Sequence, residues 1–205
     1  MPVIVIANPK GGVGKSTLAT NLAGWLARQG RAVMLGDLDV QQSSRDWLAA
    51  RPAGLPEIRG WDIAEERLLR PPKGTTHVVL DTPAGLSGTR LDVVMKMADK
   101  LLIPLQPSLF DIRATHTFVQ ALREHPRATK VQLGLVGMRS RDHTHALEHL
   151  HEFVATLPVP LVADLRDTQN YVHLAARGIT LWDVAPGRVA RDLEQWQPLL
   201  DWISR

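Results

Sequence analysis

One stretch near the start of the chain decides its fold, and it reads Asn8-Pro9-Lys10-Gly11-Gly12-Val13-Gly14-Lys15-Ser16-Thr17. It follows an apolar run at residues 3–7 and opens a helical pattern at residues 18–29. Glycines between a strand and a helix N-terminus let backbone N–H groups surround a phosphate, which the helix dipole also favours. The stretch therefore predicts a phosphate-binding loop in which Lys15 reaches the β- and γ-phosphates and the Ser16 hydroxyl ligates Mg²⁺.

Two residues depart from the general pattern of a phosphate-binding loop. Pro9 stands where that pattern has its first glycine, and Lys10 precedes a pair of glycines. The alternative interpretation is a glycine-rich turn before a helix, with both lysines merely solvated. The apolar run before the loop and the helical pattern after it favour phosphate binding.

With these departures the segment is similar to the deviant Walker A box of the ParA/MinD family of ATPases. The resemblance implies that ATP binds this loop, and the contacts come from Lys10, Gly11, Gly12, Val13, Gly14, Lys15, Ser16 and Thr17. In that family the lysine that matches Lys10 reaches across a nucleotide-sandwich dimer to the ATP of the partner. Lys10 and Lys15 are therefore both expected to take part in catalysis.

Two aspartates follow the second strand-like run, residues 32–36, in the segment Asp37-Leu38-Asp39-Val40-Gln41. The carboxyl end of a strand is where open α/β sheets hold ligands. The segment resembles the D-x-D-P-Q segment of the ParA family, with Val40 in place of proline. The match implies that Asp37 supports the Mg²⁺ shell and that Asp39 positions or activates the attacking water. The alternatives are a pair of turn aspartates, or a nucleotide-binding module without hydrolysis if Val40 misplaces Asp39.

A third acidic residue, Asp81, ends the apolar run at residues 78–80 and precedes a loop that contains proline and glycine. This arrangement resembles the Walker B strand and the switch II loop of the family. The resemblance implies that Asp81 holds Mg²⁺ through water and that residues 82–88 sense the γ-phosphate. A strand, an aspartate and a turn are usually structural when found alone, but here they follow the two earlier motifs in order.

Two later segments carry weaker signals. Residues 104–111 are similar to a proline-containing segment that borders the nucleotide and the dimer interface in ParA proteins, but a strand-to-helix turn capped by Ser108 or Asp111 explains them equally well. In the family a polar residue after the next strand, here residues 131–136, helps to hold the adenine. Arg139 falls near that position and is expected to stack its guanidinium group on the base.

The histidines offer one metal-binding pattern. His145, Glu148 and His149 match H-x-x-E-H, and two histidines four residues apart on a helix can bind Zn²⁺. The pattern arises easily in a chain with 8 histidines and has no clear third ligand. A solvated helix face is the preferred interpretation.

Length and composition limit the architecture. The 205 residues suit a single domain, residues 1–205, and alternating strand and helix patterns predict an α/β fold. The expected form is a doubly wound, mostly parallel sheet flanked by helices, as in P-loop NTPases. The absence of cysteine excludes disulfides, thiolate metal sites and Fe–S clusters. Further expected elements are helices at 42–50, 63–69, 91–98 and 144–156 and strands at 57–61, 101–105 and 161–163.

The C-terminal region distinguishes between branches of the family. Its apolar positions are spaced 4, 3, 4 and 3 residues apart, as in Val189, Leu193, Trp196, Leu200 and Ile203. MinD-like members end in a basic amphipathic helix that binds the membrane, whereas this segment carries acidic residues and a proline. The stripe is therefore expected to pack on the sheet as core.

The resemblance covers essentially the whole chain and implies a Mg²⁺-dependent ATPase of the small ParA branch, which lacks an N-terminal helix-turn-helix domain. Such a protein partitions or positions a plasmid, a chromosome region or a protein assembly. Its ATP-bound homodimer binds nonspecific DNA, and a ParB-like or other adaptor protein stimulates hydrolysis. The net charge of +3 permits DNA binding without requiring it.

The basic residues considered for that surface are Arg166, Arg177 and Arg188, and separately Arg123, Arg127, Lys130, Arg139 and Arg141. The chain begins directly with a strand-like run, without the features of a secretory signal, and has no apolar stretch that could span a membrane. The expected location is the cytoplasm, on the nucleoid and not the membrane. The alternatives are a MinD-like ATPase that cycles on and off the membrane, and a metabolic P-loop enzyme such as a ligase or kinase.

Overall fold

The computed structural model describes residues 1–61 and 71–205, and its centre is a seven-stranded parallel sheet. The strand order is β3-β2-β4-β1-β5-β6-β7. The strands are β1 Val3–Ile6, β2 Val33–Asp37, β3 Ile58–Trp61, β4 His77–Asp81, β5 Lys100–Leu105, β6 Gln132–Ser140 and β7 Leu161–Arg166. This arrangement confirms the predicted fold class. The helix expected at residues 63–69 lies outside the described residues.

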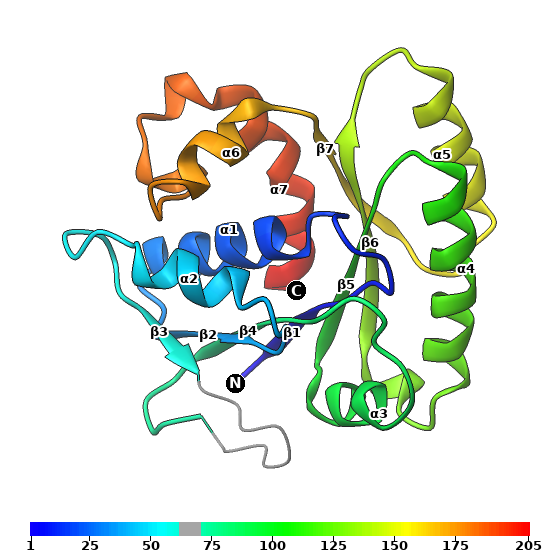
Figure 1. The fold of residues 1–205 in the computed structure, drawn as a ribbon, viewed down its shortest axis with the longest axis horizontal. Coiled ribbons are helices and arrows are strands. Elements are labelled where there is room, and N and C mark those ends of the chain that lie inside the picture. The colour runs from blue at the N-terminus through cyan, green and yellow to red at the C-terminus, as the bar shows by residue number, and fades with distance from the viewer. Residues whose placement is uncertain (62–70) are drawn as a thin grey trace.

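Helices cover both faces of the sheet (Figure 1). The α-helices are α1 Lys15–Arg28, α2 Ser43–Ala49, α3 Gly88–Met97, α4 Leu109–Glu124, α5 His145–Ala155, α6 Gln169–Ala175 and α7 Ala190–Ser204. Three short 3₁₀ helices are η1 Ala128–Lys130, η2 Leu181–Asp183 and η3 Pro186–Arg188. Helices α1, α2, α6 and α7 lie on one face, and α3, α4 and α5 lie on the other. The two faces of the sheet therefore have separate hydrophobic cores.

The central strand β1 shows why the sheet must be covered on both sides. Its residues are all buried, and successive side chains of a strand point to opposite faces. Ile4 and Ile6 belong to the core beneath α1 and α7, whereas Val3 and Val5 belong to the core beneath α3, α4 and α5. A continuous apolar run is what such a strand requires.

The C-terminal helix α7 packs on the sheet, as the apolar stripe predicted. Trp196 is fully buried, and Leu200 and Ile203 are buried with it in the core that includes α1. Pro198 lies within the helix and does not end it. The ammonium group of Lys100 donates to the carbonyl oxygen of Trp202 at 2.7 Å, which ties α7 to β5.

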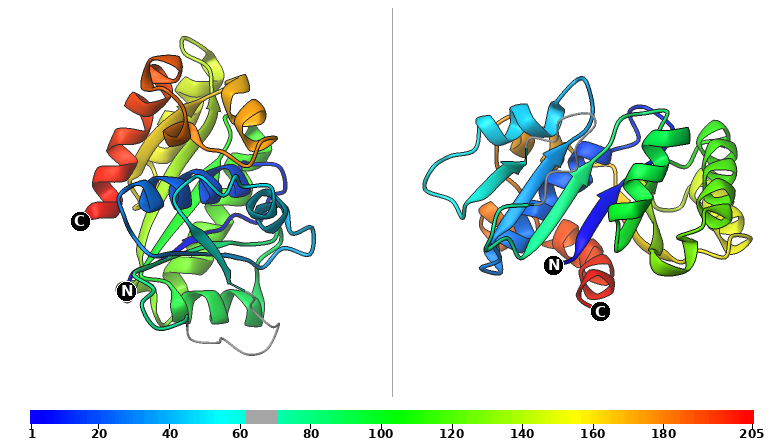
Figure 2. Two further views of the ribbon diagram at one scale, coloured as in Figure 1. Left: turned by 90° about the vertical axis from the view of Figure 1, so that its left-hand side faces the viewer. Right: turned by 90° about the horizontal axis from the view of Figure 1, so that it is seen from below.

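Both chain ends lie on the same side of the molecule, away from the phosphate-binding loop (Figure 2). Within the described ranges, no helix has the length and apolar character needed to cross a membrane. Helix α6 and the 3₁₀ helices were not predicted, because they are short and lack a clear apolar period.

Candidate functional site

The predicted phosphate-binding loop connects β1 to α1 at the carboxyl edge of the sheet. Gly12 and Gly14 have φ values of 73° and 100°, which L-amino acids with side chains rarely adopt. A Cβ atom on Gly14 would also lie 2.6 Å from Cε of Met138 in β6. The backbone conformation therefore favours glycine at this position, and the end of the Met138 side chain would have to move to make room for a Cβ atom.

Lys15 is buried at the first position of α1. Its ammonium group donates to the carbonyl oxygen of Lys10 at 2.7 Å, within the loop. Burial lowers the pKa of Lys15, while the negative charges of Asp81 and Asp39 act in the opposite direction. Phosphate oxygens would compete with the Lys10 carbonyl for this ammonium group.

Asn8 supports the loop and was not identified from the sequence. Its side chain is fully buried, and Nδ2 donates to the carbonyl oxygen of Pro104 at 2.7 Å and to Oγ1 of Thr115 at 3.2 Å. Its Oδ1 accepts from the backbone N–H of Lys10 at 2.8 Å. A polar residue that directly follows a buried strand was the available signal for this role.

The segment at residues 104–111 also contacts the loop. Ser108 caps α4 by accepting from the backbone N–H of Asp111 at 3.2 Å, which confirms one of the two interpretations of this segment. In addition, Nε2 of Gln106 donates to the carbonyl oxygen of Gly12 at 2.8 Å. The segment therefore both starts a helix and braces the phosphate-binding loop, and its place at a dimer interface stays a prediction.

The register of the sheet brings the predicted acidic residues together. Asp37 at the end of β2 is paired with Asp81 at the end of β4, and Asp81 is also aligned with Ile6 just before the loop. Oδ1 of Asp37 accepts from the backbone N–H of Asp39 at 3.0 Å, and Oδ2 accepts from the backbone N–H groups of Ser44 and Arg45. Asp37 thus stabilises the loop that follows it and the start of α2. Its contribution to a Mg²⁺ shell stays a prediction.

Asp81 is the most strongly perturbed acid of the site. Its side chain is 1% exposed, and its Oδ2 accepts from the hydroxyl of Ser44 at 2.7 Å. Burial raises the pKa of Asp81 to about 6; the negative charge of Asp37 adds to the rise, whereas the hydroxyls of Ser16 and Ser44 and the ammonium group of Lys15 oppose it.

The second oxygen of the Asp81 side chain, Oδ1, is buried and has no hydrogen-bond partner among residues 1–61 and 71–205. Buried polar atoms are almost always hydrogen-bonded, so an exception needs an explanation. Carboxylate oxygens commonly hold Mg²⁺, which usually keeps several of its waters. Asp81 and Ser16 therefore fit a Mg²⁺ ion with its water shell.

Asp39 lies in the turn between β2 and α2. Its Oδ1 accepts from the backbone N–H of Gln41 at 3.0 Å, and its charge raises the pKa of Lys15. Gln42 has a φ of 51°, a strained value for this residue type, and Val40 is 85% exposed. The turn therefore forms with valine in place of proline, and the charge of Asp39 acts on Lys15 from within it.

Arg139 lies on the same edge of the sheet, at the end of β6. Its neighbour Met138 packs against Gly14 of the loop, and Arg139 itself is exposed with a φ of 53°. Strained backbone of this kind persists where surrounding structure enforces it, often at functional sites. Its contact with an adenine base stays a prediction.

The histidine pattern in α5 forms a local pair. Nδ1 of His145 lies 3.0 Å from Oε2 of Glu148, and both side chains are largely exposed. Over residues 1–61 and 71–205, no three His, Asp or Glu side chains are grouped so that they could hold a metal ion by themselves. A site built from Ser16, Asp81, water and phosphate oxygens is of a different kind.

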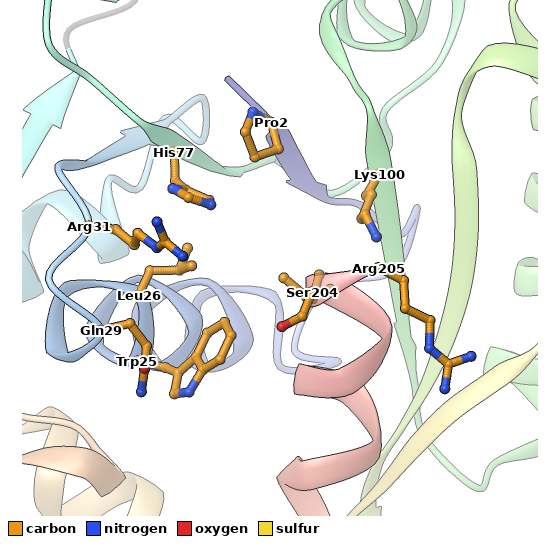
Figure 3. Close-up of a pocket in the computed structure, with 10 residues that line it drawn as sticks. Pro2, Trp25, Leu26, Gln29, Arg31, His77, Lys100, Ser204 and Arg205 are labelled. Carbon is orange, nitrogen blue, oxygen red and sulfur yellow. The ribbon is translucent and has the colours of Figure 1, made fainter.

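A cavity of about 380 Å³ lies at the opposite edge of the sheet (Figure 3). Its lining includes the basic residues Arg31, Lys100 and Arg205, and it lies at the C-terminal ends of α1 and α7. Helix C-termini favour positive charge, and Lys100 already donates to a carbonyl group of α7. The basic lining therefore has a structural explanation, and the cavity is remote from the phosphate-binding loop.

Comparison with known proteins agrees with this geometry. Residues 4–181 match the family described as the CobQ/CobB/MinD/ParA nucleotide binding domain. A "Maintenance of carboxysome distribution protein A" from Gloeobacter kilaueensis is 41% identical over 116 residues, which cover 54% of this chain and 51% of that protein. The chain thus aligns with about half the length of this relative.

Two other relatives are matched over a larger share of their length. The protein of the same name from Halothiobacillus neapolitanus is 28% identical, with 92% of this chain and 91% of that protein covered. The "Chromosome-partitioning ATPase Soj" of Thermus thermophilus is 29% identical, with 66% and 67% covered.

Solved structures share the fold. A putative plasmid partition protein of Borrelia burgdorferi bound to AMPPNP superposes with a TM-score of 0.72 and 16% identity, with 98% of each chain covered. A McdA–ATP complex from Cyanothece gives a TM-score of 0.70 and 19% identity, with 97% and 96% covered. With a family match over most of its length and the phosphate-binding loop in place, this chain belongs to the CobQ/CobB/MinD/ParA family of nucleotide-binding domains.

Proposed function

We propose that residues 1–205 act as a single Mg²⁺-dependent ATPase domain that positions cargo in the cell through an ATP-dependent dimer on DNA. The observation that carries the proposal is the meeting of Lys15, Asp39 and Asp81 around one glycine-rich loop that also holds Lys10. The named relatives support a positioning role, because they include a chromosome-partitioning ATPase and carboxysome distribution proteins.

The residues of the loop have separable tasks in this proposal. The backbone N–H groups of residues 10–17 bind the phosphates, and Lys15 places its charge at the β- and γ-phosphates. Asp39 orients the attacking water, and Arg139 stacks on the adenine. Ser16, and Asp81 through water, would hold Mg²⁺, which would supply positive charge against the negative charge that develops on the phosphates.

The dimer links this chemistry to DNA. Lys10 contacts the ATP of the partner subunit, so the dimer forms with ATP and separates after hydrolysis. Among the candidate basic residues, Arg166 pairs with Asp192, and Arg141 pairs with Asp167 but is largely exposed. Exposed side chains are also those of Arg123, Lys130, Arg177 and Arg188. Exposed residues of this kind would bind the phosphate backbone without reading sequence. A ParB-like or other adaptor stimulates hydrolysis and returns the protein from the nucleoid to the cytoplasm.

The proposal is tested by binding to random-sequence DNA with ATP, with ADP and without nucleotide. ATP with Mg²⁺ is expected to raise the affinity at least about 10-fold over ADP, because one dimer binds with two copies of the basic surface. Lys15→Ala is the matched control and should show no nucleotide effect. Equal DNA binding in all three states, at low and moderate salt, would contradict the DNA-linked function.

A further inference from the structure

Ser44 occupies an unusual position between the two acidic strands. It is the second residue of α2, and its side chain is fully buried, whereas the preceding Ser43 is exposed. Its hydroxyl donates to Oδ2 of Asp81 at 2.7 Å, and its backbone N–H donates to Oδ2 of Asp37 at 2.8 Å. One residue therefore holds a carboxylate at the end of β2 and another at the end of β4.

The hydroxyl of Ser44 is not needed to cap its own helix. Helix α2 begins without a side-chain hydrogen bond from its N-cap residue, Gln42, and its first N–H groups are served by Asp37. The Ser44 hydroxyl instead contacts a residue 37 positions further along the chain. This buried hydrogen bond joins two elements that are distant in the sequence, so its effect is to hold Asp81 and not to cap α2.

The contact makes the two oxygens of Asp81 unequal. Oδ2 is fixed by Ser44, whereas Oδ1 is buried and has no hydrogen-bond partner in the part of the chain that the structure describes. A carboxylate whose one oxygen is held cannot rotate freely, so the orientation of the free oxygen is set as well. Residues that orient a metal-holding group in this way commonly affect metal affinity as strongly as 10- to 100-fold.

We propose that Ser44 is the positioning residue of the Mg²⁺ site, where it holds Asp81 so that Oδ1 faces a metal-bound water. This inference rests on the proposed binding of ATP with Mg²⁺. Ser44 also anchors the end of the turn that carries Asp39, because its backbone N–H binds Asp37 at the start of that turn. The metal-holding acid and the water-orienting acid therefore share one anchor.

The test is the dependence of ATP affinity on Mg²⁺, measured as the ratio of dissociation constants for a fluorescent ATP analogue in EDTA and in Mg²⁺. Ser44→Ala is expected to reduce this ratio about 10-fold, with the affinity in EDTA unchanged. Ser44→Thr retains a hydroxyl and should restore most of the ratio. Ser43→Ala, one residue away and exposed, should match the parent protein.

Two results would overturn the inference. One is a Ser44→Ala protein with the parent ratio. The other is a loss of affinity that is equal in EDTA and in Mg²⁺, which would make Ser44 a structural residue of the turn. A parent protein whose ATP binding does not respond to Mg²⁺ would instead contradict the proposed function itself, so the two failures can be told apart.

Discussion

At the scale of single residues, Lys15 and Asp81 are both held away from solvent at the edge of the sheet. Burial lowers the pKa of Lys15 and raises that of Asp81, and the attraction between the two charges limits both shifts. Perturbed ionisable groups of this kind are concentrated at functional sites. We therefore predict an effect of Lys15 on ATP binding and an effect of Asp81 on the stability of the protein.

Replacement of Lys15 by alanine should weaken ATP binding about 10- to 150-fold, because a hydrogen bond to a charged group contributes about 1.5–3 kcal/mol. The fold should persist, since the hydrogen bond that the Lys15 ammonium group donates among the described residues goes to a carbonyl group of its own loop. Isothermal calorimetry with ATP and Mg²⁺ measures the loss, and circular dichroism checks the fold. Unchanged affinity would remove Lys15 from the phosphate site.

Asp81 should make the stability of the protein depend on pH. Its pKa is about 6 in the folded chain and 3.8 ordinarily, so between these values the folded state binds more protons than the unfolded state. The contribution of Asp81 to the free energy of unfolding therefore falls as pH rises from about 4 to about 6. Above that window, the ionised Asp81 lowers the free energy of unfolding by at most about 3 kcal/mol.

Asp81→Asn removes this cost and should stabilise the protein without nucleotide by about 1–3 kcal/mol at pH 8, with the difference closing toward pH 4. Urea unfolding across this pH range measures it. Asp46→Asn, at an exposed position of α2, is the control and should follow the parent. A difference that is the same at pH 4 and pH 8 would mean that the ionisation of Asp81 is not its cause.

At the scale of elements, η2 joins α1 to the end of α2. The side chain of Asp183 in η2 is fully buried and binds Nη1 of Arg51 at 2.9 Å and Nε of Arg28 at 3.0 Å. It also accepts from the backbone N–H and the hydroxyl of Thr180. Gly24 allows this approach, because a Cβ atom there would collide with Thr180.

Asp183→Ala should cost about 3–5 kcal/mol of unfolding free energy, because it leaves the buried charge of Arg51 without its carboxylate partner. Arg28→Ala removes a partly exposed partner of the same carboxylate and should cost less than about 1 kcal/mol. Urea unfolding of both variants tests the contrast.

The pKa of Asp183 also predicts how the stability contributed by this cluster depends on pH. Burial alone would raise it, but hydrogen bonds from Arg51 and Thr180 hold the pKa below its usual value. The stabilisation by Asp183 should therefore be complete at pH values above the usual pKa of an aspartate. It should be lost as the pH falls through the lowered pKa of Asp183. Equal losses in the two variants, or a loss independent of acid pH, would contradict this account of the cluster.

At the scale of the whole molecule, the sequence predicted the features that repeat along the chain or match a known motif. The buried run of β1, the loop before α1 and the apolar stripe of α7 each have a periodic or spaced signal. The family resemblance assigned both Asp37 and Asp81 to Mg²⁺, and the register of the sheet places them side by side.

Other residues of the site could not be found in this way. The side chains of Asn8, Ser44 and Gln106 form hydrogen bonds with residues 37 to 107 positions away. Such contacts leave no period in the sequence, and each residue type is also ordinary in a turn or at a helix start. Their roles follow only from the packing of loops that the sheet brings together.

The most direct test of the account is the molar mass of the protein in solution with ATP and Mg²⁺, measured by light scattering. ADP should leave a monomer of 22.7 kDa, ATP should double that mass, and Asp39→Ala should keep the doubled mass after the parent has hydrolysed its ATP. Lys10→Ala should remain monomeric with ATP. A parent protein that stays monomeric with ATP, or a Lys10→Ala protein that dimerises as the parent does, would contradict the nucleotide-driven dimer.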